Sequence, residues 1–190
     1  MGRPAVSNSV RIIGGEHRGR VLRFPDAAGL RPTADRVRET LFNWLQPQIR
    51  GAHCLDLFAG SGVLGFEAAS RGAARVVMVE DARKVYDSLV RNRALLKLEE
   101  RVELVNRDAL KWLGSCDERF DILFLDPPFN RGLLQPVIDR LAASVQPVPG
   151  ARVYIEQDLH EEPPGLPANW TMLREKVAGQ VRYCLVGVEA

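Results

Sequence analysis

The chain has 190 residues, 46% hydrophobic and 26% charged, which is typical of one soluble globular domain with a sizeable core. Three cysteines without a CxxC pair argue against a disulfide framework and a cysteine zinc site, and the three scattered histidines suggest no metal cluster. No apolar run approaches the ~18 residues of a membrane span and no signal segment is visible, so we expect a cytoplasmic protein.

The net charge of +2 conceals an uneven distribution along the chain. Residues 1–50 contain nine arginines and four acids, a balance of +5, whereas the other 140 residues carry −3. Arginine supplies 22 of the 26 basic side chains, and its planar fork suits phosphates and guanine edges. The N-terminal charge indicates a polyanionic partner, with a simply solvated basic surface as the alternative.

The first elements are short and rich in glycine. Residues 10–13 and 20–24 are β-prone runs separated by glycines, which predicts a β-hairpin that buries little of its surface. Residues 25–32 have the composition of a linker. We therefore expect a basic arm and linker over residues 1–31 and a larger domain over residues 32–190.

A helix is predicted next, followed by alternating strands and helices. Thr33 is expected to cap a helix ending near Gln46, whose apolar stripe recurs every four residues. The predicted strands of the alternating region are residues 53–58, 75–80, 102–106, 120–126 and 152–156, and the predicted helices lie near residues 62–71, 82–97 and 132–145. Residues 170–177 and 181–188 complete the pattern as an antiparallel hairpin. This order predicts an α/β, Rossmann-like fold with a mostly parallel seven-stranded sheet.

The first strand of this region leads directly into a glycine-rich turn. Gly60, Gly62 and Gly65 match G-x-G-x-x-G, and Glu80 follows 20 residues after Gly60, where a ribose-binding acid belongs. Taken alone, this pattern is the dinucleotide fingerprint. A glycine-rich turn between a strand and a helix that serves only the fold is the simpler alternative.

Two further acids favour a different cofactor. Asp56 precedes the glycines, and Asp108 follows the next strand but one. Carboxylates there oppose a pyrophosphate, but they suit S-adenosylmethionine, which carries a sulfonium, an amine and no phosphate. The alternatives are that Asp56 only binds the amides of its own loop, and that Glu80 and Asp108 are solvated.

The fourth strand of the alternating region ends in Asp126-Pro127-Pro128-Phe129. Ligands of open α/β sheets bind at this edge, and the prolines donate no N–H. Asp126 and the Pro127 carbonyl can each accept a hydrogen bond from one N–H of an exocyclic amine and so localise its lone pair for methylation. Phe129 can stack on the base. Such a base must leave its stack to enter the pocket. The alternative is that the two prolines only end the strand and that Phe129 is part of the hydrophobic core.

These features resemble class I S-adenosylmethionine-dependent methyltransferases, and specifically the RsmD family. The Asp126–Phe129 tetrad is similar to the (D/N)PP(Y/F) motif of amino-methyltransferases. The stretches that carry the family resemblance are Arg11–Gly15, Arg18–Arg20, Leu30–Leu45, Asp56–Gly62, Asp126–Gly132, Pro167–Trp170 and Arg174–Gln180.

The resemblance implies an enzyme that makes N(2)-methylguanosine in 16S ribosomal RNA of assembling 30S subunits. It implies that Asp126, Pro127, Pro128 and Phe129 receive the base. The cofactor contacts that we expect are Thr33, Arg36, Asp56, Phe58, Ala59, Gly60, Ser61, Gly62, Glu80, Asp81, Asp108 and Ala109, with Thr33, Arg36 and Glu39 on the helix that caps the donor pocket. No metal is expected, and a monomer is the default.

The arm then has a role in RNA binding. We expect Arg11, Arg18, Arg20 and Arg23 to bind RNA phosphates, together with Arg131 and Arg182 near the site. A structural ribbon with solvated arginines is the alternative.

Three other functions stay open from the residues alone. An amino-methyltransferase of DNA adenine or protein glutamine would use the same acceptors. A dinucleotide-dependent oxidoreductase would leave Asp56 and the Asp126–Phe129 tetrad without a role. A non-catalytic RNA-binding assembly factor would use only the arginines.

Overall fold

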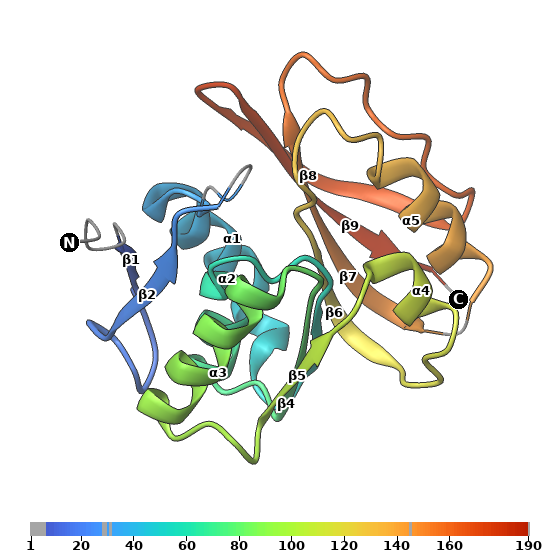
Figure 1. Ribbon diagram of the computed structural model, residues 1–190. Helices are drawn as coiled ribbons and strands as arrows, with labels where there is room; N and C mark the ends of the chain where they lie inside the picture. The colour runs from blue at the N-terminus through green and yellow to red at the C-terminus, as the bar shows by residue number, and fades with distance from the viewer. Residues whose placement is uncertain (1–6, 28–29, 31, 145, 190) are drawn as a thin grey trace.

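The computed structural model describes residues 7–27, 30, 32–144 and 146–189. Residues 1–6 of the predicted arm and Arg31 lie outside the described part. The chain forms a seven-stranded sheet in the order β5-β4-β3-β6-β7-β9-β8, with a separate two-stranded ribbon beside it (Figure 1). The strands of the main sheet are β3 (His53–Asp56), β4 (Arg75–Glu80), β5 (Val102–Asn106), β6 (Phe120–Leu125), β7 (Pro147–Asp158), β8 (Trp170–Ala178) and β9 (Val181–Val188).

Strands β3 to β7 pair in parallel, and β9 inserts antiparallel between β7 and β8. This confirms the predicted sheet with its terminal hairpin. Gly179 and Gln180 alone connect β8 to β9, and Gly179 takes the positive φ of 62° that this tight turn requires.

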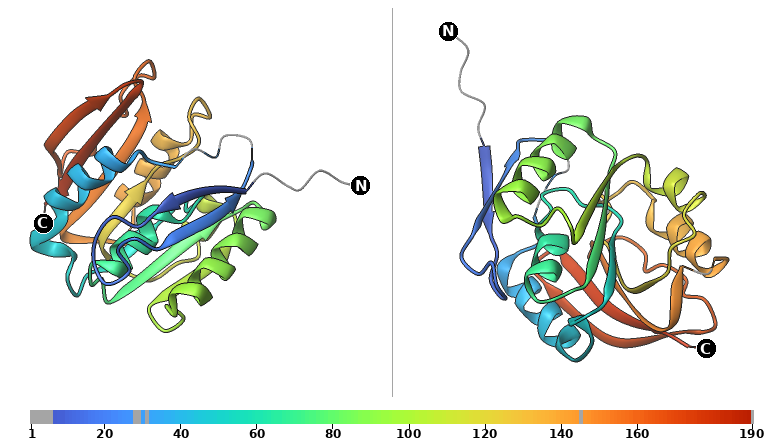
Figure 2. Two further views of the ribbon diagram at one scale, coloured as in Figure 1. Left: turned by 90° about the vertical axis from the view of Figure 1, so that its left-hand side faces the viewer. Right: turned by 90° about the horizontal axis from the view of Figure 1, so that it is seen from below.

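Helices cover both faces of the sheet (Figure 2). They are α1 (Asp35–Ile49), α2 (Val63–Ser70), α3 (Arg83–Leu96), α4 (Ala109–Leu113) and α5 (Leu134–Ala142). One apolar core lies between the sheet and α1, α2 and α3, and a second lies between the sheet and α4 and α5. Every helix in the described part falls short of the length or apolarity that a membrane crossing needs.

The beginning of α1 differs from the prediction. Ala34, not Thr33, is the N-cap residue, and no side chain caps this helix. The Thr33 hydroxyl instead contacts two carboxylates that are remote in sequence, so it is unavailable to the first turn. The helix also continues past Gln46, through Pro47, to Ile49.

The predicted hairpin is present as β1 (Ser7–Arg11) and β2 (Val21–Pro25), which pair antiparallel. The expectation that it buries little is wrong. Ile12 and Leu22 are completely buried, because they join the core formed by α1, α2 and α3. The Asn92 side chain of α3 accepts a hydrogen bond from the Arg23 amide and donates one to the Arg23 carbonyl, at 3.2 and 2.9 Å.

The register of the parallel strands places several acids at one edge of the sheet. Asp56 pairs with Phe124 across β3 and β6, and Leu125 pairs with Ile155 across β6 and β7. Asp126 therefore follows β6 at the height at which Glu156 lies in β7. Strand β3 lies between β4 and β6, where the strand order reverses and where open α/β sheets bind ligands.

Candidate active site

The glycine loop connects β3 to α2 and depends on the absence of side chains. Gly60 and Gly62 have φ angles of 51° and 81°, which other residues rarely adopt. At Gly65 an added Cβ would lie 2.7 Å from the Met78 sulfur, so this glycine lets α2 pack closely on β4. The loop therefore presents backbone atoms at the sheet edge. Phe58 is partly exposed there, while Ala59 and Ser61 are buried.

Glu80 ends β4 and faces this loop. Its carboxylate accepts hydrogen bonds from the Gly60 amide at 3.0 Å and from the Ala82 amide at 2.8 Å. Burial raises the pKa of the Glu80 carboxyl, and the neighbouring Asp81 raises it further. Each Glu80 oxygen retains a lone pair, so the carboxylate can still accept hydrogen bonds from a ligand.

Asp56 lies behind the loop, with only 1% of its surface exposed. Its carboxylate accepts the Gly65 amide at 3.0 Å and also bonds the Phe58 backbone. Burial raises the pKa of Asp56 to about 7, and the Glu80 carboxylate adds to this effect. Asp56 thus binds the backbone of its own loop and of α2, and its expected contact with the cofactor stays a prediction.

The other predicted cofactor residues lie on both sides of the glycine loop. Asp108 caps α4 by accepting the Lys111 amide at 2.9 Å, and Ala109 is buried behind it. Arg36 and Glu39 are exposed on α1, and neither side chain makes a hydrogen bond within the described residues. Thr33 lies elsewhere, beside the end of β6.

A cluster of polar groups surrounds Asp126. The Thr33 hydroxyl lies 3.2 Å from Asp126 Oδ2 and 3.1 Å from Glu156 Oε2, and the Tyr154 hydroxyl lies 2.7 Å from the same Glu156 oxygen. Desolvation, followed by the nearby carboxylates of Glu156 and Asp56, holds the pKa of Asp126 well above its ordinary value.

The rest of the tetrad completes this corner of the site. Pro127 is buried, Pro128 is exposed and Phe129 is partly exposed. The Phe129 ring is therefore accessible, as base stacking requires. The structure thus brings Asp56, Glu80 and Asp126 to one edge of the sheet.

This edge is acidic, which bears on the cofactor. Carboxylates lie at the ends of β3 and β4, directly after β6 and near the end of β7, and they would repel a pyrophosphate. S-adenosylmethionine carries a sulfonium, an α-amine, ribose hydroxyls and an adenine amine, all of which carboxylate oxygens attract or accept. The residues present therefore fit this methyl donor.

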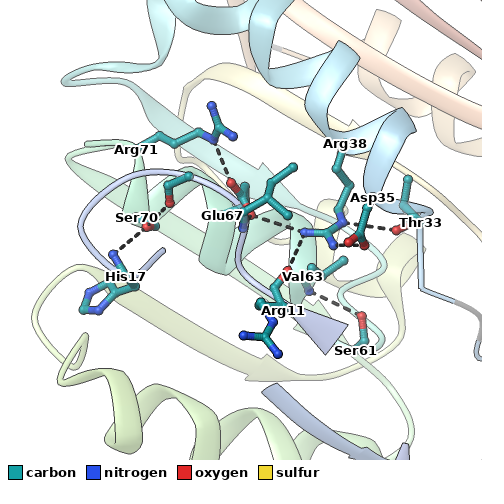
Figure 3. A network of polar contacts seen from close by, with 12 residues as sticks. Arg11, His17, Thr33, Asp35, Arg38, Ser61, Val63, Glu67, Ser70 and Arg71 are labelled. Carbon is teal, nitrogen blue, oxygen red and sulfur yellow. Dashed lines mark hydrogen bonds and ion pairs between the residues drawn. The ribbon is translucent and has the colours of Figure 1, made fainter. Parts of the chain in front are cut away.

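Two groups of polar residues went unrecognised in the sequence. Glu156 ends a predicted strand, and the reasoning applied to Glu80 and Asp126 could have identified it. The second group surrounds Arg38, a completely buried cation of α1 (Figure 3). Arg38 pairs with Asp35 at 2.5 Å and with Glu67 at 3.3 Å, and it donates to the carbonyls of Arg11 and Thr33.

The predicted RNA-binding arginines lie at the surface. Arg11, Arg18, Arg20 and Arg23 are exposed, as is Arg131. No side chain of these five forms an ion pair with a described carboxylate, whereas Arg182 pairs with Glu175 at 3.7 Å. Arg11 also lines a groove between the ribbon and the start of α1 whose wall includes Thr33. Thr33 also contacts Asp126, so one lining residue of this groove belongs to the Asp126 cluster.

The strand order, glycine loop and acidic edge together define a class I methyltransferase fold. The profile of the family described as Conserved hypothetical protein 95 matches residues 10–187. Over 184 residues the chain is 50% identical to Ribosomal RNA small subunit methyltransferase D of Escherichia coli K12, covering 97% of this chain and 92% of that protein. The protein of the same name from Haemophilus influenzae is 44% identical over 96% of this chain and 95% of its own. The chain belongs to this family, the RsmD family.

Solved structures agree with this assignment. The Escherichia coli methyltransferase yhhF is 47% identical, with a TM-score of 0.90 over 96% of this chain and 99% of its own. A 16S rRNA N2 guanine methyltransferase of Thermus thermophilus, solved with AdoMet and guanosine, is 26% identical, with a TM-score of 0.68. It matches 97% of this chain, which spans 50% of that longer protein.

Proposed function

We propose that this chain transfers a methyl group from S-adenosylmethionine to the exocyclic N2 amine of a guanine in 16S ribosomal RNA. The substrate is an assembling 30S subunit, the enzyme acts as a monomer, and S-adenosylhomocysteine is the second product. The observation that carries the proposal is the position of Asp126 and Pro127, two acceptors beside a glycine loop flanked by carboxylates. The family assignment supports the same reaction.

The donor supplies a methyl carbon bonded to a sulfonium. Glu80 holds the ribose hydroxyls, because its carboxylate is already oriented by the Gly60 and Ala82 amides. Asp108 accepts the adenine amine through the oxygen that does not cap α4. Asp56 fixes the loop between them through the Gly65 amide.

The acceptor amine is held by the end of β6. Asp126 and the Pro127 carbonyl each accept a hydrogen bond from one N–H of the amine. These two bonds localise the nitrogen lone pair toward the methyl carbon. Phe129 stacks on the base plane and stabilises it by about 1–3 kcal/mol. Positioning of the two reactants accounts for most of the rate enhancement.

The test uses tritiated S-adenosylmethionine with small subunits from a strain that lacks its own enzyme. Bare RNA, DNA and protein serve as parallel acceptors, and the labelled products are separated by chromatography. Label in N(2)-methylguanosine of subunit RNA is expected. Label in DNA adenine or in protein would instead indicate another amino-methyltransferase. No transfer, with donor binding intact, would indicate a non-catalytic assembly factor.

Two variants then test the assigned roles. Asp126→Ala should lower turnover about a hundredfold or more while donor affinity by calorimetry stays unchanged. Glu80→Ala should weaken donor binding. Asp139→Ala, an exposed acid of α5, is the matched control and should match the unmodified enzyme in both measurements. A near-normal rate for Asp126→Ala would refute its role.

A further inference from the structure

The Thr33 hydroxyl contacts two carboxylates but carries a single proton. It lies 3.2 Å from Asp126 Oδ2 and 3.1 Å from Glu156 Oε2, so it can donate to only one of them. The other contact is a hydrogen bond only if that carboxyl itself carries a proton. Two hydrogen bonds at the Thr33 hydroxyl therefore require one proton between Asp126 and Glu156.

The hydrogen bond from Tyr154 indicates which of the two carboxyls carries this proton. Its hydroxyl donates to Glu156 Oε2 at 2.7 Å, the same oxygen that lies near Thr33. With Glu156 ionised, Oε2 accepts from both Tyr154 and Thr33, and a protonated Asp126 donates to Thr33. Each of these three contacts then has one donor and one acceptor. The reverse assignment would require Glu156 Oε2 to carry its own proton and accept the Tyr154 proton as well.

The resting arrangement conflicts with the proposed function of Asp126. A protonated Oδ2 donates a hydrogen bond, whereas an amine N–H needs an acceptor. The conflict is resolved if the Asp126 proton moves to Thr33 while the Thr33 proton moves to Glu156. Both shifts follow hydrogen bonds that are already formed.

We propose that Thr33 and Glu156 are positioning residues that take the proton from Asp126 when the acceptor amine binds. This inference rests on the proposed function. Before the reaction the pair holds one proton. When the nitrogen–carbon bond forms, the carbon–sulfur pair stays with sulfur, and the excess amine proton passes to Asp126. The pair then holds two protons and releases one to water as the product leaves.

Other titratable or charged groups face the cluster. The Asp56 carboxylate of β3 acts on Asp126 and disfavours its ionised form. Arg38 of α1 donates to the Thr33 carbonyl, although its charge is shared with Asp35 and Glu67. Tyr183 of β9 packs on Tyr154, with ring centroids 6.5 Å apart. None of these groups lies between Asp126 and Glu156 as Thr33 does.

The experiment measures single-turnover methyl transfer to subunit RNA as a function of pH. Glu156→Gln should move the acidic limb of the profile to higher pH by about one unit or more, because Asp126 must then lose its proton to water. Thr33→Val should move the limb further, because the ionised Glu156 still opposes ionisation of Asp126. Thr33→Ser should restore the original profile. Asp139→Asn, an exposed acid of α5, is the control.

A merely structural role would lower the rate by one factor at every pH. If the acidic limb of the pH profile does not move in either Glu156→Gln or Thr33→Val, the inference is overturned. If the unmodified enzyme does not methylate guanine at all, the proposed function itself is overturned. Infrared difference spectra against Asp126→Asn provide a test without turnover. A protonated Asp126 band is expected in the unmodified protein near neutral pH and should weaken in Glu156→Gln; its absence from the unmodified protein would also contradict the inference.

Discussion

Phe129 follows two prolines at the end of β6 and remains partly exposed. Phe129→Ala should raise the KM for RNA by roughly 5- to 150-fold, since base stacking on an aromatic ring is worth about 1–3 kcal/mol. Donor affinity, measured by calorimetry, should not change. Phe129→Tyr keeps the ring and should retain substrate capture. An equal loss of RNA and donor binding in Phe129→Ala would instead indicate a structural residue.

The buried Asp56 carboxyl predicts a pH dependence of stability. A carboxyl whose pKa is higher in the folded chain than in the unfolded chain destabilises the fold as pH rises between the two values. For Asp56 this interval runs from 3.8 to about 7. The Tm of Asp56→Asn relative to the unmodified protein should therefore rise across the interval and level off above it. Asp139→Asn should show no such trend, and parallel Tm curves for Asp56→Asn would contradict the assignment.

At the scale of residues, sequence reasoning found acids whose strand and motif were both visible. Glu80 and Asp126 were found in this way. Thr33 was expected at the helix cap, but its hydroxyl lies between Asp126 and Glu156, and its expected contact with the donor stays a prediction. Asp126 lies 93 positions and Glu156 lies 123 positions after Thr33 in the sequence, so no local pattern contains these contacts.

At the scale of elements, the ribbon is attached to the domain through Glu67. This buried carboxylate of α2 accepts the Ile13 amide and pairs with Arg38 and Arg71. Glu67→Ala should reduce the free energy of unfolding by about 3–5 kcal/mol, because it removes the buried carboxylate beside Arg38 and leaves this buried cation, among the described residues, an ion pair with the exposed Asp35 alone. Urea unfolding measures this change.

Glu103→Ala is the matched control for that change. Glu103 pairs with Arg75 at 2.5 Å, but both side chains are more than two-fifths exposed, at 49% and 42%. Loss of such a surface pair should cost about 0–1 kcal/mol. If Glu67→Ala costs no more than Glu103→Ala, the network does not hold the ribbon.

The elements themselves were largely predictable, because apolar runs and amphipathic stretches alternate clearly from residue 53 onward. Helices α2, α3 and α5 begin and end within a few residues of their predicted bounds. The five-residue helix α4 is too short to show a period and was not predicted. The burial of the ribbon depends on α3, whose Asn92 binds it from 69 positions away.

At the scale of the whole molecule, the ribbon arginines predict how RNA affinity depends on salt. Replacing Arg11, Arg18, Arg20 and Arg23 by Gln should reduce the slope of log affinity against log salt by roughly 0.7 for each phosphate that is no longer bound. The control replaces four exposed cations outside the ribbon, Lys84, Arg91, Lys97 and Arg119, by Gln. An unchanged slope in the ribbon variant would show that these arginines do not bind phosphates.

The attachment of the ribbon has a consequence for target choice. Hydrogen bonds join the ribbon to α2 and α3, and Arg38 donates to the carbonyls of both Arg11 and Thr33. The arginines that we expect to bind phosphates and the end of β6 that we expect to bind the base therefore belong to one connected unit. We therefore expect the enzyme to methylate only a guanine that can leave its stack at a set distance from the phosphates bound by the ribbon. Target selection would then depend on the shape of the folded RNA, and the nucleotide sequence around the target would matter only through that shape.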